Sequence, residues 1–481
     1  MTAATSTPQD SVIIASTVSS RSRWIWILTS LLLGGVILFL PAPHGLSPLA
    51  HRVVAILAFA VMLWASQALN SGITSILMLG LLIIAGVKPS EALVGFASPP
   101  FWLLLTVLFY GFAMKKSGLA ERVSYCVLSL APCTYGGILG AFLVVGFLLS
   151  LGIPSMTVRT AIMTPISWAL VQSLGLKKFS RGSALIILTT VEMAVLPGLA
   201  FLSGSLAGPT VEATFQTKHL PISWLSYARI ITFPTILLCL MILVANYLVL
   251  RPEGRLTVST TFARERLREL GAIRSSELIT AFVVVVSVLF WITDTHHHLP
   301  SFLVGMFAMA VFAATGILED HEIATGVSWP LLLFLGGIFG LSNVIQNLKI
   351  TDWFAGAFVP MIIHVVGALP VLAVLMALAM FILRFIDPSS LIAIPVLFLS
   401  VIDVTVAAGI PPMVLMAPIL IASMPFWLPY QNFWIVLAEG ITQEEAFTGK
   451  QRVALATTYA IVVVLTVVFS SAYWKLIGAI H

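Results

Sequence analysis

Charged residues are scarce in this chain of 481 residues, where Asp, Glu, Lys and Arg together make up 9%. A soluble domain of this length needs far more charge to cover its surface, so the composition excludes a soluble protein. Hydrophobic residues make up 59% of the chain, and apolar runs of about 20 residues recur along it. Both features predict an all-α polytopic membrane protein.

Other absences narrow the function. The three cysteines, Cys126, Cys133 and Cys239, are scattered in apolar surroundings, which excludes a disulfide framework or a thiolate metal cluster. No basic patch with interleaved aromatic residues is present, so nucleic acid is not an expected partner. The chain lacks HExxH, GxSxG and GKS/GKT motifs and shows no nucleophile–base pair, so we predict that it is not an enzyme. We assign His296–His298 to a solvated loop between spans, not to a metal site.

The apolar runs predict about 11 transmembrane helices surrounded by membrane lipids. We predict a disordered cytoplasmic tail at residues 1–23, not a signal peptide, because Arg21 and Arg23 follow the tail instead of preceding it. With the N-terminus inside, most of the 24 lysines and arginines fall on the cytoplasmic side, which suits the bacterial inner membrane. The first span lies within residues 24–50. The predicted spans are 24–40, 53–69, 74–87, 101–114, 184–202, 224–249, 278–293, 302–317, 329–345, 411–427 and 453–473.

Two apolar regions are interrupted in the middle. Residues 135–171 are broken at Pro154 and residues 358–402 at Pro388, and polar residues gather at each break. Two full spans or one re-entrant helical hairpin would give the same topology in each region. Irregular backbone at membrane depth is tolerated only where protein or water surrounds it, so the breaks favour two hairpins.

The chain also carries a weak internal repeat. WLLLTVLFYGFAMKKSGL, from Trp102, resembles WPLLLFLGGIFGLSNVIQNL, from Trp329, and each precedes a broken region whose second arm contains a proline, Pro165 or Pro395. An odd number of predicted spans separates the two units, so we expect inverted repeats, which are typical of secondary transporters with a midplane site. The predicted units are 51–255 and 275–481, joined by an amphipathic cytoplasmic linker at 256–274.

The first break, IPSMTVRTAIMTP, places polar side chains deep in an apolar chain. We expect one helix to end near Gly152–Pro154 and another to begin near Ser155, and Ser155 or Thr157 can cap its free amides. Free amides and the helix dipole favour an anion there, and Arg159 adds a forked donor for a carboxylate or sulfate. Alternatively, Arg159 reaches the cytoplasm or pairs with an acid, although ionisable groups within the membrane are functional by default. The candidate substrate ligands are Ser155, Met156, Thr157, Arg159 and Thr160.

The second break reads RFIDPSSLIAIP, from Arg384 to Pro395. Asp387 before Pro388 has the pattern of an N-cap followed by the first helical residue, and we favour that role over a direct ligand role. Arg384 can pair with Asp387, which would mute both charges, or serve as an anion ligand. The candidates here are Asp387, Ser389 and Ser390.

Two further polar stretches follow apolar runs. LPGLAFLSGSLAGP (196–209) and LPYQNFW (428–434) offer donors and carbonyls where helices unwind, or they cap helices at the membrane edge. The candidates are Ser203, Ser205, Tyr430, Gln431 and Asn432.

These segments resemble the divalent anion/sodium symporter family, the di- and tricarboxylate and sulfate carriers, over most of the chain after the first span. FYGFAMKKSGLAERV resembles the family's segment before its first hairpin, and SSAYWKLIG its C-terminal pattern. PSMTVRTAIMTPI is similar to its Ser-Asn-Thr hairpin motif, in the form closest to the dicarboxylate exchanger branch, and LSGSLAGP stands at its Thr-Gly-Thr-Pro-Pro-Asn type loop. The resemblance implies an eleven-span homodimer in which a transport domain moves like an elevator against a scaffold domain.

Two departures from the family pattern bear on the coupling ion. Met156 stands where the family has asparagine, and the second Ser-Asn-Thr falls on residues 385–387, which do not match it. The resemblance places a coupling Na⁺ near Ser155, Gly204 and Asp387. Loss of the asparagine favours anion exchange instead, with Arg159 in place of a sodium charge.

The resulting hypothesis is a secondary active transporter of small divalent organic anions, dicarboxylate-like, working as an exchanger or a sodium-coupled symporter. The helix N-termini and Arg159 would hold the anion, and Ser155 and Thr157 would orient it. An arsenite or sodium/proton carrier, in which Asp387 handles the cation, is one alternative. A passive anion channel is another, although the paired breaks argue against it.

Overall fold

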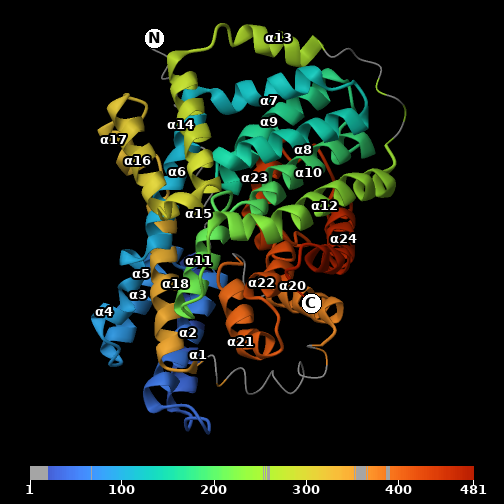
Figure 1. Cartoon of the computed structure of the whole chain (residues 1–481). Coiled ribbons are helices and arrows are strands. Elements are labelled where there is room, and N and C mark those ends of the chain that lie inside the picture. Colours follow the sequence, from blue (N-terminus) through green and yellow to red (C-terminus); the bar gives the residue numbers. More distant parts are fainter. Residues whose placement is uncertain are drawn as a thin grey trace.

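The computed structural model describes residues 20–66, 68–252, 254, 256, 261–350, 353, 365, 367–385 and 390–480. All regular elements in these ranges are helices (Figure 1). Eight of the described helices are long and apolar enough to cross a membrane, and the bent pair α6–α7 makes a ninth. The predicted all-α polytopic fold is confirmed.

The first part of the chain begins with a pair of helices and ends with a long helix, which follows a helix broken by a 3-10 turn. Its elements are α1 (Ser20–Phe39), α2 (Pro48–Ser66), α3 (Ser71–Ile84), α4 (Pro89–Ala92), α5 (Val94–Ala97), α6 (Pro99–Ser117), α7 (Leu119–Leu130), α8 (Tyr135–Gly152), α9 (Met156–Ser173), α10 (Arg181–Val195), the 3-10 helix η2 (Leu196–Ala200), α11 (Ala207–Thr217) and α12 (Trp224–Leu250).

The second part repeats much of this order. Its elements are α13 (Thr261–Glu269), α14 (Ser275–Ile292), α15 (Asp294–His297), α16 (Ser301–Ala314), α17 (Asp320–Thr325), α18 (Trp329–Asn347), α20 (Leu369–Leu383), α21 (Ala393–Ala407), α22 (Pro412–Ile421), η3 (Pro429–Gln431), α23 (Phe433–Ile441) and α24 (Gly449–Leu476). In both parts a helix pair, α8–α9 or α20–α21, precedes a helix broken by a 3-10 turn and then a long helix, α12 or α24.

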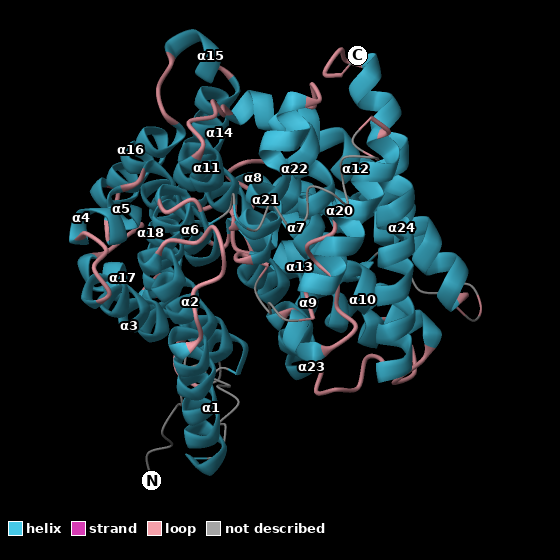
Figure 2. Cartoon of the chain, turned by 90° about the horizontal axis from the view of Figure 1, so that it is seen from below, coloured by secondary structure: helices cyan, strands magenta, loops and turns pink. Residues whose placement is uncertain are grey.

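The helices form two groups, which Figures 1 and 2 show from perpendicular directions. One group holds α1–α6 and α14–α18, and the other holds α7–α10, α12, α13 and α20–α24. One apolar cluster lies mainly among α2, α3 and α18, while a larger one fills the space between α8, α9, α10, α12, α22 and α24 and extends to α6, α14 and α16. Helix α11 packs against α6 and α18 of the first group and α21 of the second.

The first break lies where the sequence predicts it. Helix α8 ends at Gly152, and α9 begins at Met156 with Ser155 as its N-cap, whose hydroxyl accepts a 3.3 Å hydrogen bond from the Val158 amide. Proline fixes its own φ and disfavours helix in the residue before it, which is why the chain leaves the helix at Ile153 before Pro154.

The second break differs from the prediction. Helix α20 ends at Leu383, but α21 begins only at Ala393, with Ile392 as its N-cap, so the prediction that this arm starts at Pro388 is wrong. Asp387, Pro388 and Ser389 lie outside the described residues. A proline does lie inside or at the start of each second arm, at Pro165 and Pro395.

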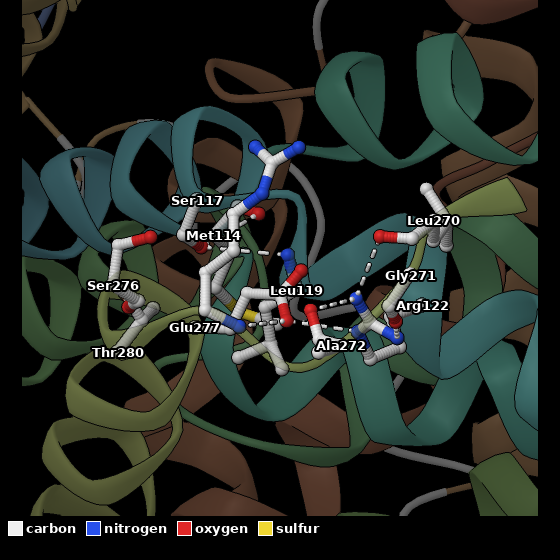
Figure 3. Close-up of polar contacts among 11 residues, drawn as sticks. Met114, Ser117, Leu119, Arg122, Leu270, Gly271, Ala272, Ser276, Glu277 and Thr280 are labelled. Atoms are coloured by element: carbon white, nitrogen blue, oxygen red, sulfur yellow. Dashed lines mark hydrogen bonds and ion pairs between the residues drawn. The ribbon is translucent and has the colours of Figure 1, made fainter.

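Helix α7 turns away from α6 by 68° at Gly118, whose φ of 84° is a left-handed conformation that glycine adopts without strain. Figure 3 shows the contact that holds α7 against α14: the Arg122 Nε donates to Glu277 of α14 at 2.8 Å. The Arg122 guanidinium also donates to the carbonyls of Leu270, Gly271 and Ala272, at 3.4, 3.0 and 3.3 Å. The linker after α13, which packs on α7, is thereby held against the start of α14.

Candidate functional site

The site is built on the first break and on the unwound segment between α10 and α11. Helix α10 ends at Val195, and the chain continues through η2 to Phe201 and Ser205 before α11 begins at Ala207. Helix α9 packs along α10, so the start of α9 lies beside this unwound segment.

Arg159, in the first turns of α9, points into the unwound segment and is fully buried. Its Nε donates to the Ala194 carbonyl at 2.5 Å and its Nη2 to the Val195 carbonyl at 3.3 Å. Its Nη1 donates to the Gly204 carbonyl at 2.7 Å and to the Ile153 carbonyl at the end of the first arm. Four N–H groups of the guanidinium thus bind carbonyls on both sides of the helix break, carbonyls that a regular helix would otherwise satisfy.

Two glycines make room for this guanidinium. A Cβ at Gly198 would lie 2.2 Å from the Arg159 Nη2 and 2.4 Å from the Gly204 carbonyl oxygen. A Cβ at Gly204 would lie 2.7 Å from the Gly198 carbonyl oxygen. Neither approach is compatible with a side chain, so glycine is required at both positions.

A second buried arginine lies at the break of the second half, at the end of the first arm instead of in the second. Arg384, at the end of α20, is fully buried and donates from Nε to the Ser423 carbonyl at 2.9 Å. Its Nη2 donates to the Gln431 carbonyl and, at 3.1 Å, to the Asn432 side-chain oxygen. Ser423 follows α22, and Gln431 ends η3, so this guanidinium also connects the two sides of a helix break.

Side chains of the long helices α12 and α24 also form hydrogen bonds with the backbone at the same breaks. From α12, the Tyr227 hydroxyl donates to the Leu199 carbonyl at 2.8 Å and the Thr232 hydroxyl to the Ala200 carbonyl at 2.9 Å. From α24, the Tyr459 hydroxyl donates to the Ile421 carbonyl at 2.5 Å and accepts from the Met424 amide at 3.1 Å. No sequence pattern distinguishes these tyrosines, because an isolated tyrosine in a span is common.

The structure brings several predicted ligands together at the first break. Ser155, Met156 and Thr157 are half-buried at the start of α9, whereas Thr160 is buried and donates back to the Met156 carbonyl at 2.9 Å. At the end of α9 facing this break, the amides of Met156 and Thr157 belong to the first turn, which has no intrahelical acceptors.

The other predicted ligands lie in the unwound segments. Ser203 is buried and accepts from the Trp224 indole at 3.1 Å, and the buried Ser205 hydroxyl has no partner within the described part of the chain. Gln431 and Asn432 are buried beside Arg384, and Ser390 is buried with a φ of 65°. Tyr430 lies in η3, and its side chain is outside the described set.

No group of three His, Cys, Asp or Glu residues that could hold a metal ion occurs among the described residues. In the histidine cluster, the His297 ring lies 2.8 Å from the Phe290 carbonyl and accepts from the Leu299 amide at 3.0 Å. These are local loop contacts.

This arrangement provides a positive charge and free helix amides beside a helix break. It suits binding of an anion.

The match to known families agrees with the geometry. The family model described as the sodium:sulfate symporter transmembrane region matches residues 21–480. The chain belongs to this family. It is therefore an integral membrane transporter and not an enzyme, and the resemblance to di- and tricarboxylate and sulfate carriers is confirmed.

Named relatives of this family member are carriers. A putative malate transporter, YflS of Bacillus subtilis, is 24% identical over 70% of this chain and 73% of its own length. The chloroplastic dicarboxylate transporter 1 of Spinacia oleracea is 24% identical over 71% of this chain, which covers 61% of the relative. In fold, the chain is similar to the YdaH transporter of Alcanivorax borkumensis, with a TM-score of 0.51, 13% identity and coverage of 95% and 97% of the two chains.

Proposed function

We propose that this protein exchanges small divalent organic anions, dicarboxylate-like, across a bacterial inner membrane. The observation that carries the proposal is the Arg159 guanidinium, fully buried and bound by carbonyls on both sides of a broken helix. The named relatives, a putative malate transporter and a dicarboxylate transporter, support this substrate class.

The anion would bind where α9 begins. The amides of its first turn and the positive end of its dipole favour negative charge, and the Ser155 and Thr157 side chains can orient a carboxylate. Arg159 lies just behind, with most of its donors bound to protein carbonyls, so it would act mainly through its charge. The second carboxylate would lie toward Ser390, Gln431 and Asn432 at the other break.

Exchange is favoured over sodium symport because the Arg159 guanidinium, which is part of the protein, supplies the positive charge that a coupling Na⁺ would otherwise supply. The Gly204 carbonyl, near which a coupling Na⁺ was predicted, accepts a hydrogen bond from Arg159 at 2.7 Å. A guanidinium cannot dissociate from the carrier as sodium does. The unloaded carrier would keep its buried positive charge, which makes its return across the membrane unfavourable unless an anion is bound.

We also propose the elevator mechanism and the inverted repeats that the sequence predicts. The smaller apolar cluster, among α2, α3 and α18, would belong to the scaffold that carries the homodimer contact. The second helix group, with both hairpins and both broken helices, would be the moving transport domain. Helix α7, turned by 68° from α6, would be an arm on the cytoplasmic surface that connects them.

Counterflow in proteoliposomes tests this function. Liposomes loaded with unlabelled dicarboxylate should take up labelled malate or succinate with saturation, equally with and without sodium, and empty liposomes should not. Citrate and sulfate complete the panel. Strict sodium dependence with uptake into empty liposomes would replace exchange by symport, and a pH-dependent cation flux without counterflow would refute the anion assignment.

A further inference from the structure

A buried carboxyl group lies in the last turn of α10, and the proposed substrate site does not use it. Glu192 is 1% exposed, and its backbone carbonyl accepts the capping amide of Leu196. Ala194 and Val195, whose carbonyls bind Arg159, follow directly in the chain.

The carboxyl group is held by one neutral side chain. The Asn246 amide nitrogen of α12 donates to the Glu192 Oε2 at 2.5 Å and to the Thr189 hydroxyl at 3.1 Å. Both N–H groups of this amide are therefore used. Asn246 and Thr189 are themselves fully buried.

Two acceptor atoms in this cluster lack a donor. Within the described residues, neither the Glu192 Oε1 nor the Asn246 Oδ1 has a hydrogen-bond partner. Turning the Asn246 amide over would place its oxygen against Oε2 at the same short distance, and two oxygens so close need a proton between them. Either orientation of the amide leaves the cluster short of a donor.

An ionised carboxylate is unfavourable here for three reasons. It would be removed from water, and no cation lies within ion-pair distance of it among the residues the structure describes. It would also lie in the last turn of a helix, where the dipole disfavours negative charge. A single proton on the carboxyl group removes the charge and turns one of its oxygens into a donor.

The ionisable groups on the helices packed against α10 do not offset the charge. Cys239 of α12 and Tyr459 of α24 interact electrostatically with Glu192 and are themselves neutral acids or anions. Arg159 of α9 binds carbonyls beyond it. Other buried or paired groups near α10 include Tyr135 of α8, placed at Gly182, Tyr227 of α12, bound to Leu199, Glu439 of α23, paired with Arg452, and Arg384, bound to the second break.

We propose that Glu192 is a proton-binding site that gates transport: the protein carries anions only while this carboxyl group holds its proton. Loss of the proton leaves an unpaired anion beside the end of α10 and disturbs the carbonyls that Arg159 binds. The proton site stands by itself, whereas the gating rests on the proposed exchange.

Infrared spectroscopy of the full-length protein tests the proton site without transport. The wild type should show a carboxylic acid C=O band that shifts in D₂O and that Glu192→Gln lacks. Glu277→Gln is the matched control, because Glu277 is equally buried but paired with Arg122, and this variant should keep the band. An unchanged band in Glu192→Gln overturns the proposal, as does a wild type without a protonated acid, which would indicate a bound cation instead.

Counterflow at a series of pH values tests the gating. Wild-type exchange should fall by about tenfold for each pH unit above the titration point of a single group, because the protonated fraction does so. Glu192→Gln should exchange at the acidic wild-type level and lose this fall, while keeping any dependence that comes from ionisation of the substrate. Equal pH profiles refute the gating.

A second measurement separates the two proposals. If Glu192→Gln does not fold, the wild-type infrared band, titrated against pH, should disappear over the range in which exchange is lost. Absence of counterflow in every protein, with the infrared difference intact, would refute the proposed exchange and leave the proton site standing.

Discussion

The two helix breaks of this protein are stabilised by the same chemistry from opposite arms of their hairpins. Arg159 stands in the second arm of the first pair, after the break, whereas Arg384 stands at the end of the first arm of the second pair, before the break. Each guanidinium is fully buried and binds acceptors on both sides of an unwound segment.

The difference between them lies in the acceptors. All four described partners of Arg159 are backbone carbonyls, while Arg384 also binds the Asn432 side chain. Backbone carbonyls cannot be changed by mutation, so the first break depends on the arginine and on glycines that let it approach. The comparison teaches that an arginine side chain can serve as a structural part of an unwound helix.

The largest effect is expected from Arg159→Ala and Arg384→Ala. Each leaves several buried acceptors without a donor, at about 1–3 kcal/mol apiece, so exchange should fall by at least about tenfold and the melting temperature should drop. Proteoliposome counterflow and thermal unfolding in detergent measure both. Arg266→Ala, at an exposed arginine of α13, is the control and should behave as wild type.

If Arg159→Ala kept full exchange, the first break would not be the substrate site. If only Arg384→Ala lost exchange, the second break would be the substrate site instead of the first.

Gly198→Ala should come next. Its Cβ would meet the guanidinium at 2.2 Å, and overpacking of this kind costs about 1–3 kcal/mol. The variant should lower both exchange and the melting temperature. Gly140→Ala in α8 is the matched control, because its Cβ would meet nothing within 4 Å, and it should be neutral or slightly stabilising. Equal behaviour of the two glycine variants would contradict the close fit around Arg159.

Glu277→Gln tests the ion pair between Arg122 and Glu277, in which the partner of the arginine is itself charged. Arg122 would lose the carboxylate at 2.8 Å but keep the three linker carbonyls, so we expect about 2 kcal/mol of destabilisation and a weaker attachment of α7. Thermal unfolding at low and high salt is the measurement. The difference from wild type should narrow only slightly at high salt, because the pair is largely buried.

The smallest effect is expected from Tyr227→Phe and Tyr459→Phe. Each removes one hydroxyl from a break, with a net cost of about 1 kcal/mol, and Tyr459 should cost more because its hydroxyl makes two hydrogen bonds. Melting temperatures of the two variants would show the order. A larger loss at Tyr227 would mean that the first break depends more on α12 than its hydrogen bonds suggest.

The long spans could be predicted from sequence because hydropathy alone identifies them. The span predicted at 224–249 is the helix Trp224–Leu250, and the break at Ile153–Ser155 follows from proline and capping chemistry. Helix α7 was missed because Glu121 and Arg122 interrupt its apolar pattern, and α11 because its Gly, Pro and Gln residues resemble a loop. Helix α23 was missed because its nine residues are too short for a span.

The partners of Arg159 could not be predicted. Backbone carbonyls carry no sequence signature, and Ala194 and Gly204 reach the guanidinium only through the packing of α9 on α10. The sequence indicated that a buried arginine at this break matters, and only tertiary structure shows what it binds.

The Arg159 charge, which is covalently part of the protein, also determines which gradients can drive transport. A guanidinium that travels outward with one anion travels back with the next, so it moves no net charge over a full cycle. Under the proposed exchange of equally charged anions, the membrane potential would then do no work on the protein. Flux would follow the anion gradients alone, and a cell could replace one internal anion by another without drawing on its membrane potential.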